Sequence, residues 1–235
     1  MMWFFVFLWQ IFACTSTLYL WSFTEKQLTH YFPSFQRIES DNRKKYIVKN
    51  VAKGGVLMFL TPPALWIINC IVFSNKWDNA LIKTMGALYA SGDLVAVATM
   101  FHKLPTTTKI HHTCVGIFAF LNTFILDYTS PHLIWRHSAI LAACSAPTYL
   151  VNAYLGLRCL HEISEKEKKR LAAFALSVYS VFISMSVSWN IVLLFLTTWD
   201  ITVVLYVLTI LLIYFDDWKL SMYLWDNSSC KKNKV

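Results

Sequence analysis

Residues 51–73 read VAKGGVLMFLTPPALWIINCIVF, a run that is almost entirely apolar. A helix needs about 20 such residues to cross the ~30 Å hydrocarbon core of a bilayer. Similar runs recur along the 235-residue chain, in which 57% of residues are hydrophobic and 14% are charged. Ordinary soluble domains have about 25% charged residues, and a single soluble core could not bury so much apolar surface. The sequence therefore predicts an all-α, multi-pass membrane protein.

The same composition excludes other classes of protein. Six cysteines in 235 residues are too few for a secreted disulfide scaffold, and the apolar content excludes a disordered chain. The net charge of +8 does not indicate nucleic-acid binding, because the basic residues lie between the apolar runs and not on one polar face. We therefore expect an integral membrane protein whose partner is membrane lipid, with homo-oligomerisation left open.

Apolar runs separated by polar connections predict seven transmembrane spans, or six if the last two are fused or re-entrant. We expect one membrane domain at 45–220, preceded by a first helix and basic connection at 1–44 and followed by a basic tail at 221–235. The seven predicted spans are 3–23, 51–73, 81–101, 106–128, 133–156, 171–197 and 199–215.

Lysine and arginine alternate between the connections. The connections at 24–50, 102–109 and 157–170, together with the tail from 216, hold 17 of them, whereas the intervening connections hold one. By the positive-inside rule, this alternation predicts a lumenal N-terminus and a cytosolic C-terminus.

Polar residues inside predicted spans are the best candidates for function, because placing them in a membrane is costly. Asp93 lies within the third span, and His111 and His112 follow Pro105 near the start of the fourth. Since these two spans are antiparallel neighbours, we expect the carboxyl group and one imidazole to meet at a similar depth. A carboxylate beside a histidine suits a general base, and a purely structural pair is the alternative.

Helical spacing extends this candidate site towards a lipid cavity. His111 shares a face with Asn122, and Ser145, Thr148 and Asn152 form a polar stripe in the fifth span. Pro147 should kink that span, and kinked helices with polar stripes favour a ring around a cavity. Such stripes also serve close helix packing. The candidate cavity residues are Tyr89, Asn122, Ser145, Thr148 and Asn152.

Several catalytic motifs are missing from the sequence. It contains no Cys-x-x-Cys, no His-Glu-x-x-His and no His-x-x-His-His, and it has seven histidines and six glycines in all. We therefore expect no metal site, no phosphate-binding glycine loop and no bound cofactor.

Two segments at a fixed separation carry a family resemblance. They are Tyr89-x-x-Gly92-Asp93-Leu94 and Leu104-Pro105-x-x-Thr108-x-Ile110-His111-His112. Together they resemble the centre of the TLC domain, which is shared by ceramide synthases, the translocating-chain-associated membrane protein and small lipid-linked proteins. Ser145-x-Pro147-x-Tyr149 resembles a further element of the small members, over a similarity that covers about 45–220. The resemblance implies a helical barrel around a central cavity.

The chain also departs from that family. Cys144 stands where small members usually have Glu, and no carboxylate lies between Ile134 and Leu157, where ceramide synthases carry acidic residues. Three hypotheses follow. The first is a protein that binds or regulates sphingolipid or phospholipid in the endoplasmic reticulum. The second is an acyltransferase that uses acyl-CoA as co-substrate, with His111 or His112 as general base and Asp93 orienting it. The third is a receptor or transporter, which only the number of predicted helices supports.

Overall fold

The computed structural model describes residues 2–229, which form helices and contain no strand. Six of these helices are long and apolar enough to cross a membrane. The seventh long segment, α5, has 19 residues and begins with a polar turn. The prediction of an all-α, multi-pass membrane protein with six or seven helices is therefore confirmed. The α-helices are α1 (Met2–Tyr31), α2 (Pro33–Gln36), α3 (Asp41–Ser74), α4 (Asn79–Met100), α5 (Thr106–Phe124), α6 (Ser138–Ser145), α7 (Tyr149–Leu157), α8 (Glu165–Leu196) and α9 (Ile201–Ser228).

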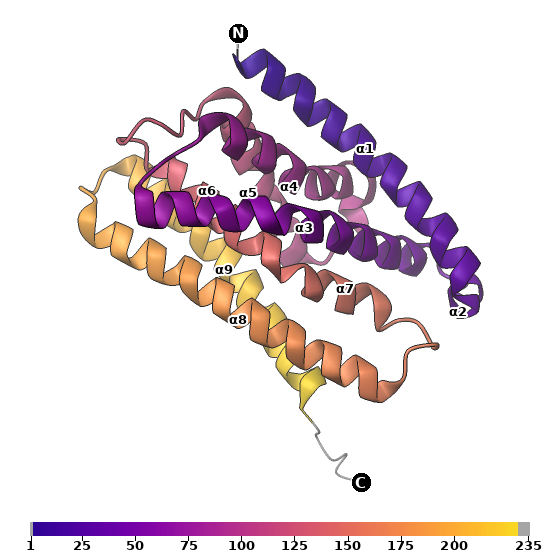
Figure 1. Ribbon diagram of the computed structural model, residues 1–235. Coiled ribbons are helices and arrows are strands. Elements are labelled where there is room, and N and C mark those ends of the chain that lie inside the picture. Colours follow the sequence, from indigo (N-terminus) through magenta and orange to yellow (C-terminus); the bar gives the residue numbers. More distant parts are fainter. Residues whose placement is uncertain (1, 230–235) are drawn as a thin grey trace.

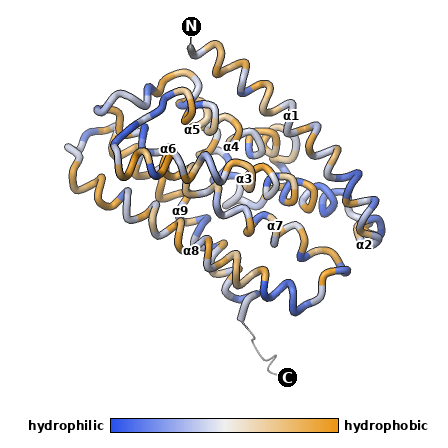
Figure 2. Tube along the Cα trace, viewed as in Figure 1, coloured by the Kyte–Doolittle hydropathy of each residue, from blue (hydrophilic) through white to orange (hydrophobic). Residues whose placement is uncertain are grey.

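The long helices run side by side in alternating directions (Figure 1), so that α1 begins at one end of the bundle and α9 finishes at the other. Hydrophobic stretches run along the helices, and a hydrophilic stretch marks the beginning of α8 (Figure 2). Large apolar side chains on α1, α8 and α9 remain exposed, among them Phe5, Phe195 and Trp218. Such an exposed apolar surface is expected where helices face lipid.

Two helices extend beyond their apolar runs into polar sequence. The Ser40 side chain accepts a hydrogen bond from the Arg43 amide, so α3 begins ten residues before the predicted span. Helix α9 is capped by Asp200, near the start of its predicted span, and it continues past residue 215 to Ser228. The polar residues at 41–50 and 216–228 are therefore parts of transmembrane-length helices, not of connections. The last part of the predicted tail, 230–235, lies outside the described residues.

The predicted fifth span is interrupted at Pro147. It consists of α6 and α7 joined by a 3-10 turn at Ala146–Thr148, and a second 3-10 turn at Ile134–His137 precedes α6. Proline has no amide hydrogen and its ring clashes with the preceding turn of an α-helix, so the helix changes course here. The α3 helix, in contrast, is continuous through its two adjacent prolines.

Helices α3 and α7 pack closely through two glycines. A Cβ placed on Gly156 would lie 2.6 Å from Cγ2 of Val51 and 3.2 Å from the carbonyl oxygen of Ile47. A Cβ placed on Gly54 would lie 3.2 Å from the backbone nitrogen of Ala153. Small residues allow two membrane helices to approach in this way, so that dispersion contacts hold them together.

The first helix is attached to α4 by side-chain hydrogen bonds. Trp9 Nε1 donates to the carbonyl oxygen of Thr84 at 3.2 Å, and Gln10 Nε2 donates to that of Ala87 at 3.1 Å. The hydroxyl groups of Thr17 and Ser91 are 2.8 Å apart. Within a membrane these bonds tie α1 to the bundle although most of its surface is exposed.

Hydrogen bonds also join two segments that lie outside the long helices. The Ser34 amide donates to Oε1 of Glu162 at 2.7 Å, and the Ser34 hydroxyl donates to Oε2. These hydrogen bonds hold the pKa of the Glu162 carboxyl below its usual value. The turn between α7 and α8 is thereby joined to α2.

We predict that Gly156→Ala lowers the stability of the folded protein by about 1–3 kcal/mol, since the added methyl group would overpack the contact with Val51. The matched control is Gly55→Ala, where a Cβ meets nothing within 4 Å. That change should leave stability unchanged or raise it by up to about 1 kcal/mol, as alanine favours helix. Thermal melting of both variants in detergent tests this, and equal melting temperatures would contradict it.

Candidate functional site

Asp93 occupies the centre of the candidate site on α4. Its side chain is completely buried, and its Oδ1 accepts a hydrogen bond from Nζ of Lys53 on α3 at 2.6 Å. A buried carboxylate is stable only when a nearby positive charge or several donors compensate for its lost hydration. Lys53 supplies that charge, and the pair joins the two helices.

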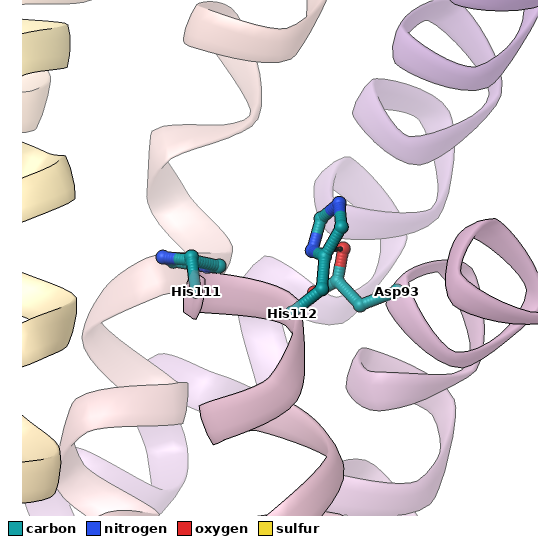
Figure 3. Close-up of side chains that lie close together, drawn as sticks. All are labelled: Asp93, His111 and His112. Carbon is teal, nitrogen blue, oxygen red and sulfur yellow. Dashed lines mark ion pairs between the residues drawn. The ribbon is translucent and has the colours of Figure 1, made fainter. Parts of the chain in front are cut away.

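His112 on α5 is the second neighbour of Asp93 (Figure 3). Its Nδ1 lies 3.1 Å from Oδ1 of Asp93, within ion-pair distance although the angle is not that of a hydrogen bond. Its Nε2 lies 2.8 Å from Nζ of Lys49. An ammonium group can only donate, so Nε2 accepts and the imidazole proton sits on Nδ1, facing the carboxylate. Lys49, His112, Asp93 and Lys53 thus form one continuous polar chain.

His111 lies to one side of this chain. In Figure 3 the His112 ring lies beside the Asp93 carboxyl group, whereas the His111 ring lies apart from both. Its Nδ1 lies 3.4 Å from Oδ2 of Asp216 on α9, within ion-pair distance and without a hydrogen bond. Adjacent residues on a helix differ by about 100° in direction. The two histidines therefore have different environments, one inside the polar chain and one towards α9.

The His111 side chain reaches a cavity inside the bundle. This cavity has a volume of about 70 Å³, and apolar residues such as Leu60, Ile82 and Phe118 form much of its wall. Its polar lining is confined to a few side chains. They are Tyr89, His111, Asn122, Tyr128, Ser138, Ser145 and Asp217.

Hydrogen bonds fix Asp217, Asn122 and Tyr128 among these polar groups. Asp217 Oδ1 accepts from the hydroxyl group of Tyr179 at 2.6 Å. Asn122 accepts from the hydroxyl group of Tyr128 at 2.9 Å, and its amide nitrogen donates to the carbonyl oxygen of Lys83 at 3.1 Å. Groups already held in this way are oriented before any ligand binds, which favours binding.

The structure brings together some of the residues singled out in the sequence and separates others. Asp93 lies beside His112, whereas His111 lines the cavity with Tyr89, Asn122 and Ser145. Within residues 2–229, Thr148 and Asn152 are not among the residues that line this cavity. The Thr148 hydroxyl donates to the carbonyl oxygen of Ser145 at 2.7 Å, as is typical of a polar side chain satisfied inside its own helix.

Four charged residues of the site were missed by the sequence analysis. Lys49 was assigned to a connection and Lys53 was passed over inside an apolar run, but both are on the inner side of α3. Asp216 and Asp217 were assigned to the tail, yet they belong to α9. The available signal was the spacing of the two lysines, since residues four apart share one face of a helix.

The cluster does not suit a metal ion, although Asp93, His111 and His112 have ligand atoms within 4.8 Å of one another. The Lys53 ammonium group is 2.6 Å from the carboxylate, and that of Lys49 is 2.8 Å from the Nε2 of His112. Two positive charges in contact with two of the three ligands would repel a cation.

Comparisons with family models, with curated proteins and with solved structures gave no match for this chain. The likeness to the TLC domain therefore rests on the sequence segments around Asp93 and the two histidines.

We predict strong coupling between Lys53 and Asp93. Asp93→Asn leaves a buried ammonium group without its carboxylate, and Lys53→Met leaves a buried carboxylate without its ammonium group. Each change should lower the free energy of unfolding by about 3–5 kcal/mol. The double variant should lose much less than the sum, because neither charge is then stranded. Thermal melting of the purified variants measures this.

The control is the pair Glu165 and Lys168, in which Glu165 is 82% exposed and the Oε1 to Nζ distance is 2.9 Å. Glu165→Gln and Lys168→Met should be nearly additive, because solvent screens exposed pairs. Additive melting shifts at Lys53 and Asp93 would show that the two residues do not act as a unit.

Proposed function

We propose that this protein binds a membrane lipid in its central cavity and thereby takes part in sphingolipid or phospholipid homeostasis. The observation that carries the proposal is the division of the cavity wall into a large apolar part and a small polar part containing His111 and Asp217. A lipid has the same division, with acyl chains that need an apolar wall and a headgroup that needs hydrogen-bond partners.

The proposed location is the endoplasmic reticulum, with the N-terminus lumenal and the C-terminus cytosolic. The alternation of basic connections supports this orientation. The end at which α3 and α8 begin is then cytosolic, and the polar chain around Asp93 lies nearer to that end. We retain the TLC-type barrel as the proposed family architecture, on the strength of the segments around Asp93 and the histidines.

The alternative function is transfer of an acyl group from acyl-CoA to an amine. The position of His111 favours it, because this imidazole lines the cavity, whereas Nε2 of His112 faces Lys49. In this reaction the amine nitrogen would attack the thioester carbon, and His111 would accept the proton released from the nitrogen. The carbon–sulfur bond would break, and the CoA thiolate would take up a proton as it leaves. Asp216 would orient His111, while Asp93 would hold His112.

We predict that filling the cavity displaces the lipid. Ala142 lines the cavity, so Ala142→Phe should remove most of the lipid that copurifies with the protein and most of its labelling by a photoreactive fatty acid. The control is Ala173→Phe, the same change at an exposed position on α8. Mass spectrometry of extracted lipid gives the readout. Equal lipid content in both variants and the native protein would exclude the cavity as the binding site.

The acyltransferase alternative makes its own prediction. If the protein transfers acyl groups from palmitoyl-CoA to a long-chain amine, His111→Ala should reduce the rate by about 10²–10⁴-fold, the usual contribution of a general base. The exposed His102 provides the control, because His102→Ala should leave the rate unchanged. If the native protein transfers no acyl group in this assay, the result contradicts the acyltransferase alternative.

A further inference from the structure

A second cavity lies outside the central one, at the end of the bundle where α3 and α8 begin and α9 finishes. It is an open cleft with a volume of about 690 Å³, and it contains four basic and two acidic side chains. The basic residues are Arg43, Arg158, Lys168 and Lys169, and the acidic ones are Glu165 and Asp226. The cleft therefore carries a net positive charge.

Ion pairing distinguishes Lys168 from the two arginines of the cleft. Glu165 Oε1 accepts from Nζ of Lys168 at 2.9 Å. Neither Arg43 nor Arg158 forms an ion pair with a carboxylate anywhere in residues 2–229. Two guanidinium groups without counter-charges attract an anion.

Arg158 is held in place before any ligand binds. Its guanidinium group lies over the Tyr223 ring, 4.7 Å from the centroid, and its Nη2 donates to the hydroxyl group of Tyr46 at 3.5 Å. Its Nε donates to the carbonyl oxygen of Leu155 at 3.4 Å. Stacking on an aromatic ring fixes the planar group and leaves further N–H donors for an oxyanion.

The cleft lies at the depth of lipid headgroups. Helices α3 and α8 contain 34 and 32 residues, which at ~1.5 Å per residue span roughly 50 Å. The hydrocarbon core is only ~30 Å thick, and the bilayer with headgroups is about 40–45 Å. The ends of these helices therefore extend into the headgroup layer, and Arg43 and Lys168 lie in the first turns of α3 and α8.

We propose that this cleft binds the phosphate group of an acidic phospholipid, with Arg43 and Arg158 as its principal ligands. The site is separate from the central cavity and does not depend on what that cavity binds. An acidic lipid is the expected source of the phosphate because the cleft opens at the membrane surface, where such lipids are concentrated. A bound lipid would bridge α3, the α7–α8 turn and α8.

The experiment uses the full-length protein in detergent and measures binding of phosphatidic acid and of phosphatidylcholine with the same acyl chains. The native protein should prefer phosphatidic acid. The double variant Arg43→Gln, Arg158→Gln should weaken that binding by roughly tenfold or more, because hydrogen bonds to a charged group are lost. Arg43→Gln alone, at an exposed position, should give a smaller loss with unchanged melting.

The control variant Lys45→Gln, Lys166→Gln removes the same amount of charge from exposed positions outside the cleft, and it should bind phosphatidic acid like the native protein. An equal loss of affinity in this control would show that binding depends only on the net charge of the protein, and it would overturn the proposal. Equal affinity for the two lipids would also overturn it. Inorganic phosphate or a soluble inositol phosphate binding as tightly as the lipid would show a site for free anions instead of lipid.

Discussion

The buried carboxylate of Asp93 constrains the whole bundle. Its side chain is completely buried, so it requires positive charge and hydrogen-bond donors in direct contact. Lys53 brings α3 to within 2.6 Å of it, and His112 brings α5 to within 3.1 Å. These contacts therefore fix the depth and the rotation of α3, α4 and α5 relative to one another. Lys49 extends the constraint, because its ammonium group fixes the His112 proton on the nitrogen that faces the carboxylate.

This arrangement gives the two histidines separate roles. The imidazole of His112 has a charged group at each nitrogen and acts within the scaffold. His111, one residue earlier, belongs to the cavity wall and has Asp216 nearby. A reactive or ligand-binding imidazole needs an accessible nitrogen, and a scaffold imidazole needs fixed partners. One His-His dipeptide thus connects the polar chain that orders the helices with the cavity they enclose.

Much of this could be predicted from the sequence because apolar runs and isolated polar residues are both strong signals in a membrane chain. The seven helical segments and the meeting of Asp93 with a histidine followed from hydropathy and antiparallel order. The lysine partners did not. Hydropathy ends a span where polar residues begin, whereas the α3 helix begins at its Ser40 cap and carries Lys49 inwards. Asp216 was misplaced for the same reason, because α9 continues past its apolar run.

The order of synthesis gives the Lys53–Asp93 pair a consequence for membrane insertion. Lys49 and Lys53 of α3 leave the ribosome before the carboxylate on α4 that neutralises Lys53. Lys53 lies nearer the beginning of α3 than its end, so it opposes insertion of this helix by less than the ~2.5–3.5 kcal/mol of a lysine at the centre of a span. The contact that joins α3 to α4 through the charges of Lys53 and Asp93 can therefore form only after α4 has been synthesised.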